Sequence, residues 1–190
     1  MTQASFQPQG YVRFDLAQGL ASTPDKRRHL VIPGEVLRAV GDDEALDQAA
    51  LRWGEEQGVA LSKLVGDDLV EQPPERFVTE LSHLLATLGW GWCQMESWGG
   101  VVFVVVRQAP RGGARRILER FLAGALSTAS NQKIACVTIS EGSTCRFLVT
   151  APEHHATIKG WVENGASAGE VASRMLAGAH LTGEPIEGRS

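Results

Sequence analysis

Apolar side chains recur at helical spacing in two long stretches of the chain. Between residues 44 and 65 the apolar positions are three and four residues apart and form one stripe, which Gly54 and Gly58 interrupt. Two glycines four residues apart in a soluble helix usually mark close packing against another helix. Residues 74–88 carry a second, narrow apolar stripe after a proline pair, so the pattern predicts a further helix there.

The apolar spacing changes from the helical period to the strand period after this second stripe. Alternation places Trp92 and Trp98 on one face of a strand and Cys93 on the other, and a Gly-Gly pair then predicts a tight hairpin turn. The returning strand, VVFVVVR over residues 101–107, is apolar on both faces. A strand covered on one side would alternate, so we expect cover on both sides, from C-terminal helices or from another subunit.

A further helix and a second hairpin follow. Residues 114–129 carry a stripe of large apolar side chains, and residues 133–150 read as two strands with a turn between them. A two-residue turn would pair Cys136 with Phe147. It would place Cys136 and Cys145 on one sheet face as diagonal neighbours, too far apart for an easy disulfide.

The order of these elements predicts an α+β fold, because the strands arrive as antiparallel hairpins and do not alternate with helices. We expect a four-stranded antiparallel sheet, made of the two hairpins and packed with helices, in a ligand- or partner-binding domain over residues 29–150. A short helix over residues 33–41 would open this domain. The other expected parts are a flexible N-terminal segment (1–28), a helical tail (151–182, with helices near 153–164 and 168–179) and a disordered end (183–190).

Composition and charge exclude several classes of function. The chain has 190 residues, of which 43% are hydrophobic and 21% charged, and its net charge of −4 argues against a nucleic-acid partner. No stretch reaches the roughly 18–20 apolar residues that a membrane span needs, and the N-terminus lacks the pattern of a secretory signal. Three cysteines without a CxxC pair fit reduced thiols. We therefore expect a cytoplasmic protein without direct membrane insertion.

Known catalytic motifs are missing from the sequence. It contains no nucleophile elbow, P-loop, HExxH helix or dinucleotide fingerprint. Cys93, Cys136 and Cys145 are possible thiol nucleophiles, but nothing nearby in sequence would lower a thiol pKa. Zinc on Cys136, Cys145 and the His154-His155 pair is the other option, yet adjacent helical histidines point about 100° apart. We expect a non-enzymatic protein with buried cysteines, no metal and no cofactor.

Tryptophans cluster around the glycine that precedes the first strand. Trp90 and Trp92 flank Gly91, and alternation would send both to the same side, where they could stack on a ligand or pack in the core. The candidate ligand-binding residues are Trp90, Trp92, Cys93 and Cys145. The candidate subunit-interface residues, all on the first hairpin, are Trp98, Val102, Val104 and Val106.

Residues 89–149 resemble the 4-vinyl-reductase-like domain family, whose fold is related to that of the transport-protein-particle (TRAPP) components. The matching pieces are LGWGWCQMES, RRILERFLAGALS and CVTISEGSTCRFLV, and the resemblance extends over about residues 29–150. Two cysteines are usual in the second hairpin of that family, with an acidic residue before the first. Here Glu141 follows Cys136, and only Cys145 fits well. The resemblance implies a TRAPP-like fold that senses a small molecule or binds a partner.

A shorter stretch, PPERFVTELSHLLATLGWG over residues 73–91, resembles a ring-forming accessory subunit of bacterial cellulose synthase. That resemblance implies a non-catalytic ring that guides glucan export at a membrane synthase, in the cytoplasm or periplasm. We expect an oligomeric accessory or scaffold protein that binds itself, a partner protein or a small apolar ligand. The alternatives are the cellulose-synthase-type subunit, a small-molecule or metal sensor with a pocket near Trp92, Cys93 and Cys145, and a thiol-dependent enzyme.

Overall fold

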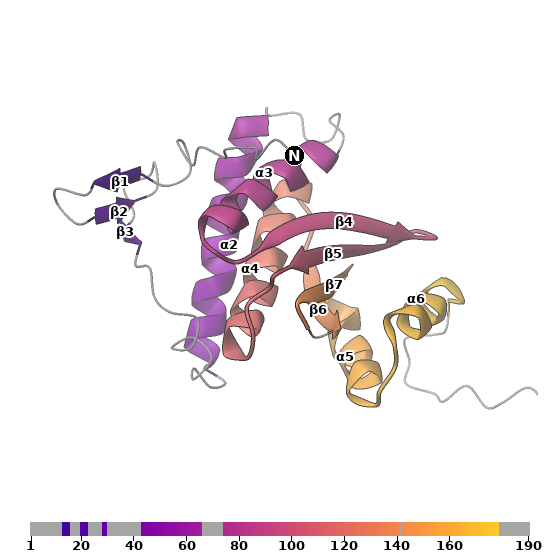
Figure 1. Ribbon diagram of the computed structural model, residues 1–190. Coiled ribbons are helices and arrows are strands. Elements are labelled where there is room, and N and C mark those ends of the chain that lie inside the picture. Colours follow the sequence, from indigo (N-terminus) through magenta and orange to yellow (C-terminus); the bar gives the residue numbers. More distant parts are fainter. Residues whose placement is uncertain are drawn as a thin grey trace, which may run out of the picture.

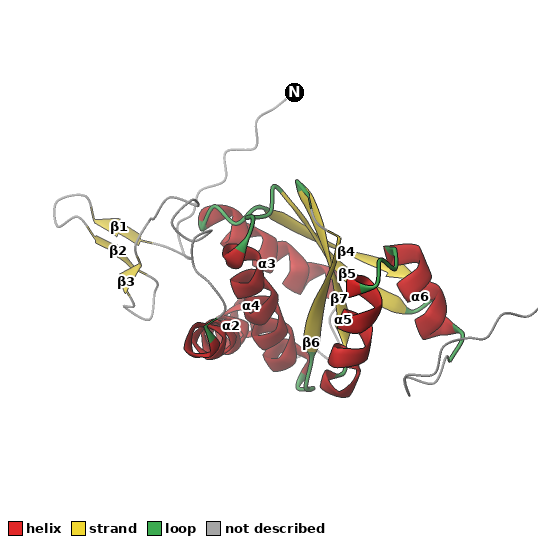
Figure 2. Cartoon of the chain, turned by 90° about the horizontal axis from the view of Figure 1, so that it is seen from below, coloured by secondary structure: helices red, strands yellow, loops and turns green. Residues whose placement is uncertain are grey.

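The computed structural model describes residues 13–15, 20–22, 28–29, 43–65, 74–140 and 142–178 of the chain (Figure 1). A four-stranded antiparallel sheet lies between two groups of helices (Figure 2). On one face lie α2 (Glu44–Val65), α3 (Pro74–Thr87) and α4 (Gly113–Ser130). On the other lie α5 (His155–Glu163), which follows a short 3-10 turn (Pro152–His154), and α6 (Ala168–Leu176). The predicted α+β class is confirmed.

The sheet has the strand order β4-β5-β7-β6, so that each hairpin is intact and the two returning strands pair in the centre. Its strands are β4 (Trp92–Trp98), β5 (Val101–Arg107), β6 (Ala135–Ser140) and β7 (Thr144–Thr150). Three short strands precede this domain: β1 (Arg13–Asp15), β2 (Leu20–Ser22) and β3 (Arg28–His29). Apart from His29, these strands are the described part of the segment expected to be flexible (1–28). The helix expected over 33–41 and the end expected over 183–190 lie outside the described residues.

The register of the second hairpin differs from the predicted one. Cys136 pairs with Val149, so the predicted pairing with Phe147 is wrong. The irregularity between Thr138 and Ser140 adds a residue on the β6 side, and the connection to β7 is longer than two residues. Cys136 and Cys145 still share one sheet face and one core cluster. They are not diagonal neighbours, because the strand partner of Cys136 is four residues from Cys145.

The close helix packing predicted from Gly54 and Gly58 is confirmed and lies between α2 and α4. A Cβ atom on Gly54 would lie 2.1 Å from the carbonyl oxygen of Phe121. The contact is reciprocal, since a Cβ atom on Gly124 would lie 2.2 Å from the carbonyl oxygen of Leu51. Only glycine allows the two backbones to approach so closely, and this contact fixes the helical layer beneath the sheet.

Strand β5 is buried on both faces, as its uninterrupted apolar run predicts. Phe103 and Val105 pack with residues of α5 and α6, such as Ile158, whereas Val104 and Val106 belong to the core under α2, α3 and α4. The chain's own tail therefore provides the second cover, so the apolar run of β5 does not require another subunit.

Two of the four predicted interface residues, Val104 and Val106, are fully buried within the chain. The partly exposed members of the predicted interface set are Val102 and Trp98.

Candidate functional site

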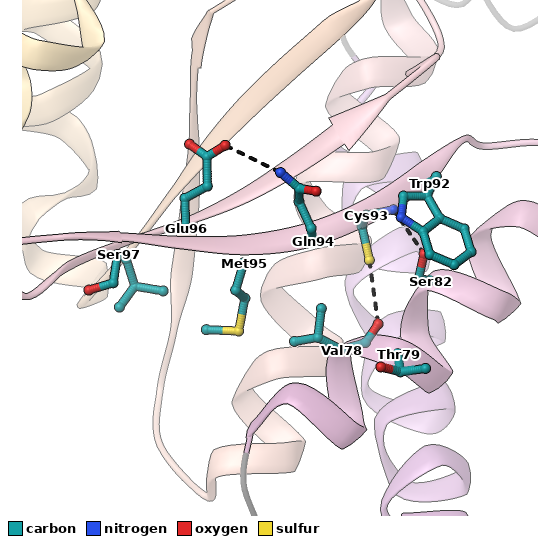
Figure 3. Close-up of a pocket in the computed structure, with 10 residues that line it drawn as sticks. Val78, Thr79, Ser82, Trp92, Cys93, Gln94, Met95, Glu96 and Ser97 are labelled. Atoms are coloured by element: carbon teal, nitrogen blue, oxygen red, sulfur yellow. Dashed lines mark hydrogen bonds between the residues drawn. The ribbon is translucent and has the colours of Figure 1, made fainter.

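A pocket of about 500 Å³ lies where helix α3 runs beside the edge strand β4 (Figure 3). Its walls are mostly apolar, with a few polar side chains among them. The lining residues are Val78, Thr79 and Ser82 from α3, all of residues 92–97 from β4, and Val102 from β5. A concave, largely apolar space with a few polar groups is the usual form of a small-molecule site.

Helix α3 is tied to the start of β4 by Cys93. The Cys93 backbone N–H donates to the Ser82 hydroxyl over 3.1 Å, and the thiol donates to the Val78 carbonyl oxygen over 3.8 Å (Figure 3). Ser82 is only 1% exposed, so its hydroxyl serves this edge strand inside the protein. These contacts hold one end of the pocket closed and fix the distance between the helix and the strand.

Further along β4 the pocket opens to solvent. Met95 points to the same side of the strand as Cys93, and it is 38% exposed. Trp92 is 48% exposed, and its ring centroid lies 6.0 Å from that of His83 on α3. Gln94 and Glu96, joined by a hydrogen bond of 3.3 Å, point to the other side of the strand (Figure 3). Two large apolar side chains thus remain half in water at the mouth of the pocket.

Two of the three thiols are poorly suited to nucleophilic chemistry. Burial raises the pKa of Cys93 to about 12, although the hydrogen bond with Ser82 opposes the shift. Burial likewise raises the pKa of Cys136. Both side chains are therefore protonated near pH 7, and a thiol is a weaker nucleophile than a thiolate. In the part of the chain that the structure describes, no three His, Cys, Asp or Glu side chains gather to hold a metal ion.

The structure brings two of the four candidate ligand-binding residues, Trp92 and Cys93, to this pocket. Trp90 is separated from them because Gly91 has a φ of +102°, which turns the chain before β4 begins. Its ring packs on Trp53 of α2, with centroids 5.2 Å apart. Cys145 is fully buried and lies across the sheet from Cys93, with β5 between them. Neither Trp90 nor Cys145 lines the pocket.

The contribution of α3 to the pocket was not predicted from the sequence. Val78 and Ser82 are four residues apart, and the fully buried Leu85 follows three residues later, so all three share one helical face. A serine inside an apolar stripe was the available signal, since a buried hydroxyl needs a hydrogen-bond partner. Its partner, the N–H of an edge strand, is visible only once the helix and strand are placed together.

Comparison with known proteins places the fold. A scan against protein-family models finds no match, and no curated protein matches the sequence. Among solved structures, the phenol-responsive sensory domain of the transcription activator PoxR, with phenol, is similar, with a TM-score of 0.52 and 14% sequence identity. The match covers 75% of this chain and 85% of that one. The chain shares the α+β fold of that sensory domain. At this identity the likeness speaks for the fold alone.

The same comparison bears on the resemblances found in the sequence. The neighbour agrees with the expected α+β fold, and no family match supports the finer family assignment. None of the findings supports a cellulose synthase subunit or an oligomeric scaffold. Across the described helices, none is both long and apolar enough to cross a bilayer.

Proposed function

We propose that this chain is a sensor-type domain that binds a small, mostly apolar molecule in the pocket between α3 and β4. The observation that carries the proposal is the exposure of Trp92 and Met95 at the mouth of a largely apolar pocket. A ligand seated there removes apolar surface from water on both side chains, and this burial provides the driving force for binding. The fold likeness to a phenol-responsive domain supports the same class of function.

The polar lining favours a ligand with one or two hydrogen-bonding groups. Thr79 and Ser97 supply hydroxyl groups among apolar walls, so the pocket suits a compact aromatic or aliphatic body with a hydroxyl or carbonyl group. A volume of about 500 Å³ has room for more than a single aromatic ring. Phenol is therefore the first probe, and phenols with larger apolar substituents are expected to bind more tightly because they bury more surface.

Ligand binding has a direct route to the rest of the domain. A molecule in the pocket contacts α3 and β4 together and adds to the contacts that Cys93 makes at one end. Strand β4 pairs along its whole length with β5, which lies at the centre of both cores. We expect a bound ligand to stiffen the contact between α3 and β4, and this stiffening is the signal that the domain would transmit through β5.

The test is a titration of the full chain with phenol and alkylphenols, followed by NMR. We expect saturable shifts at the Met95 methyl group and the Trp92 indole N–H, because both lie at the pocket mouth. Met95→Asp places a charge in an apolar wall and should weaken binding by about tenfold or more. Val59→Asp is the matched control, since Val59 on α2 is 44% exposed and lies outside the pocket lining.

Two results would contradict this proposal. One is the absence of saturable shifts with any of these phenols, and the other is an equal loss of binding in both variants. Sedimentation of the wild type and of Met95→Asp adds an independent readout. A dimer that Met95→Asp breaks would reassign this surface to contact between copies of the chain.

A further inference from the structure

A second and larger cleft, of about 760 Å³, lies at the opposite edge of the sheet from the apolar pocket. It is bounded by the N-terminal half of α4, by strand β6 and by α5, which pack against β6 from its two sides. Arginine and lysine side chains line it from both walls, together with two glutamates, Glu119 and Glu163.

The charge of this cleft is opposite to that of the whole protein. Five of its lining residues are Arg or Lys and two are Glu, whereas the chain as a whole has a net charge of −4. Arg111 is exposed on the loop before α4, and the exposed Lys159 projects from α5 on the far wall. Positive charge therefore faces the cleft from both walls, and the low dielectric constant of the protein walls focuses the electric field in the cleft.

The two carboxylates of the cleft are held by neighbours of their own. Glu119 accepts hydrogen bonds from the Thr138 N–H over 2.8 Å and the Thr138 hydroxyl over 2.6 Å, and His155 Nε2 lies 3.7 Å away. Glu163 pairs with Lys159 over 3.9 Å, on the exposed surface of α5. Glu119 is thus directed at the edge of β6. Because five Arg and Lys residues face these two carboxylates, the lining keeps an excess of positive charge.

Part of the arginine cluster is already oriented by an acidic residue outside the cleft. Asp47 of α2 accepts from Arg116 over 2.7 Å and from Arg120 over 3.3 Å. Both arginine side chains remain about one-third exposed, at 36% and 35%. Asp47 neutralises part of their charge, but it also holds the two guanidinium groups in place, so less conformational entropy is lost when they bind an anion.

The start of α4 adds a directional contribution. The N-cap of this 18-residue helix is Gly112, which as a glycine has no side chain to accept from the first N–H groups. The N-terminus of a helix carries partial positive charge and backbone N–H groups that suit an anion. Arg115 lies in the first turn and lines the same cleft, so guanidinium groups and the helix N-terminus converge there.

We propose that the cleft between α4 and α5 binds a small molecule that carries phosphate groups. Guanidinium groups match phosphate oxygens in a planar, two-point fashion, and four arginines with a lysine suit an anion of more than one charge. The concave shape and the acidic remainder of the chain favour a small molecule over a nucleic-acid backbone, which needs an extended basic surface. Val137 and Val162 provide an apolar wall for the carbon part of such a ligand. This site is separate from the proposed apolar pocket.

The experiment titrates the full chain with pyrophosphate at low ionic strength and follows backbone amides by NMR. We expect saturable shifts confined to residues 111–120 and to α5, with a dissociation constant measured by calorimetry. Arg111→Gln with Lys159→Gln should raise that constant by about tenfold or more, because charge-assisted hydrogen bonds from both walls are removed. Both side chains are exposed, so the variant should keep the wild-type spectrum elsewhere.

A matched control distinguishes specific binding in the cleft from a general effect of net charge. Arg52→Gln with Lys63→Gln removes the same charges from exposed positions on α2, outside the cleft, and should leave the dissociation constant within about twofold. Absence of saturable shifts in the wild type would overturn the proposal, and so would an equal loss of affinity in both double variants. Tighter binding of a single-stranded oligonucleotide than of pyrophosphate would also overturn it, in favour of a nucleic-acid surface.

Discussion

Glu119 has surroundings unlike those of an ordinary surface carboxylate, since its side chain is only 16% exposed. Burial alone would raise the pKa of Glu119, but its contact with His155 and its hydrogen bonds with Thr138 outweigh burial and lower it below the usual 4.5. The carboxylate accepts the outward N–H of an edge strand, which would otherwise lack a strand partner. A charged group is retained at this position because it satisfies the backbone of β6.

We expect Glu119→Gln to lower the free energy of unfolding by about 2 kcal/mol at pH 7, through loss of hydrogen bonds to a charged group. A lowered carboxyl pKa stabilises the fold above the unfolded-state pKa, and this contribution is lost as the pH falls through the folded-state pKa. The difference between wild type and variant should therefore shrink below about pH 4.5. Urea unfolding from pH 7 to pH 3 measures it. A difference that is undiminished at pH 3 would contradict the assignment, and Glu163→Gln, at a side chain 65% exposed, is the control.

At this scale the sequence predicts burial better than it predicts partners. The apolar character of cysteine correctly favours buried thiols, and Cys93, Cys136 and Cys145 are all buried. The partners of Ser82 and Glu119 come from β4 and β6, 11 and 19 residues away. Such contacts depend on how strands and helices are placed, which side-chain type alone does not encode.

Among the elements, the α2–α4 contact depends most on single residues. Gly54 of α2 faces the backbone of Phe121, and Gly124 of α4 faces the backbone of Leu51. Each glycine costs up to about 1 kcal/mol of helix propensity against alanine. The helices keep them because close approach buries Leu118, Phe121 and Leu122 fully.

Gly54→Ala should destabilise the protein by about 3 kcal/mol, because the new Cβ atom would lie 2.1 Å from a backbone oxygen and the helices must separate. Gly160→Ala is the matched control on α5. Apart from its chain neighbours and the backbone of its own helix, no atom lies within 4 Å of the Cβ position there, so the variant should gain up to about 1 kcal/mol from helix propensity. Thermal and urea unfolding of both variants measure the contrast. Equal effects would show that the α2–α4 contact tolerates a methyl group.

Periodicity predicts elements well and pairing less well. The expected helix over 44–65 and the first hairpin agree with α2, β4 and β5, because their signals are long and local. The second hairpin has the expected strands but another register, since its turn lacks the Asn-Gly, Asp-Gly or Gly-Gly pair that most strongly fixes a two-residue hairpin. The separation of Trp90 from Trp92 has a similar origin in one glycine with positive φ.

For the whole molecule, the decisive arrangement is a sheet enclosed between two helical layers whose hydrophobic cores differ in size. Helices α2, α3 and α4 form the larger core, whereas the smaller core has Ile158, Val171 and Ala172 as its buried helical members. The doubly apolar β5 required two covers, as its sequence predicts. The sequence left open whether the tail or a second subunit supplies the outer one, because both would present the same kind of apolar surface.

We expect Val171→Asp to detach α6 while the larger core stays folded, since a charge cannot remain at a fully buried position without a partner. Hydrogen exchange should show loss of protection in α6 and faster exchange at the outer face of β5, with α2 and α4 unchanged. Ser173→Asp, at an exposed position of the same helix, should leave exchange as in the wild type. Global unfolding in Val171→Asp would show instead that the two layers form one cooperative unit.

The two edge strands of the sheet, β4 and β6, differ in how their outward backbone groups are covered. At β6, Glu119 takes an outward N–H and helices pack on both sides of the strand, whereas no described strand lies along the outer side of β4 beyond Cys93. An open margin can accept a strand from another molecule. Two copies joined through β4 about a two-fold axis would each cover this margin of the other. Growth by strand addition would then stop at a pair and could not run on into a fibre.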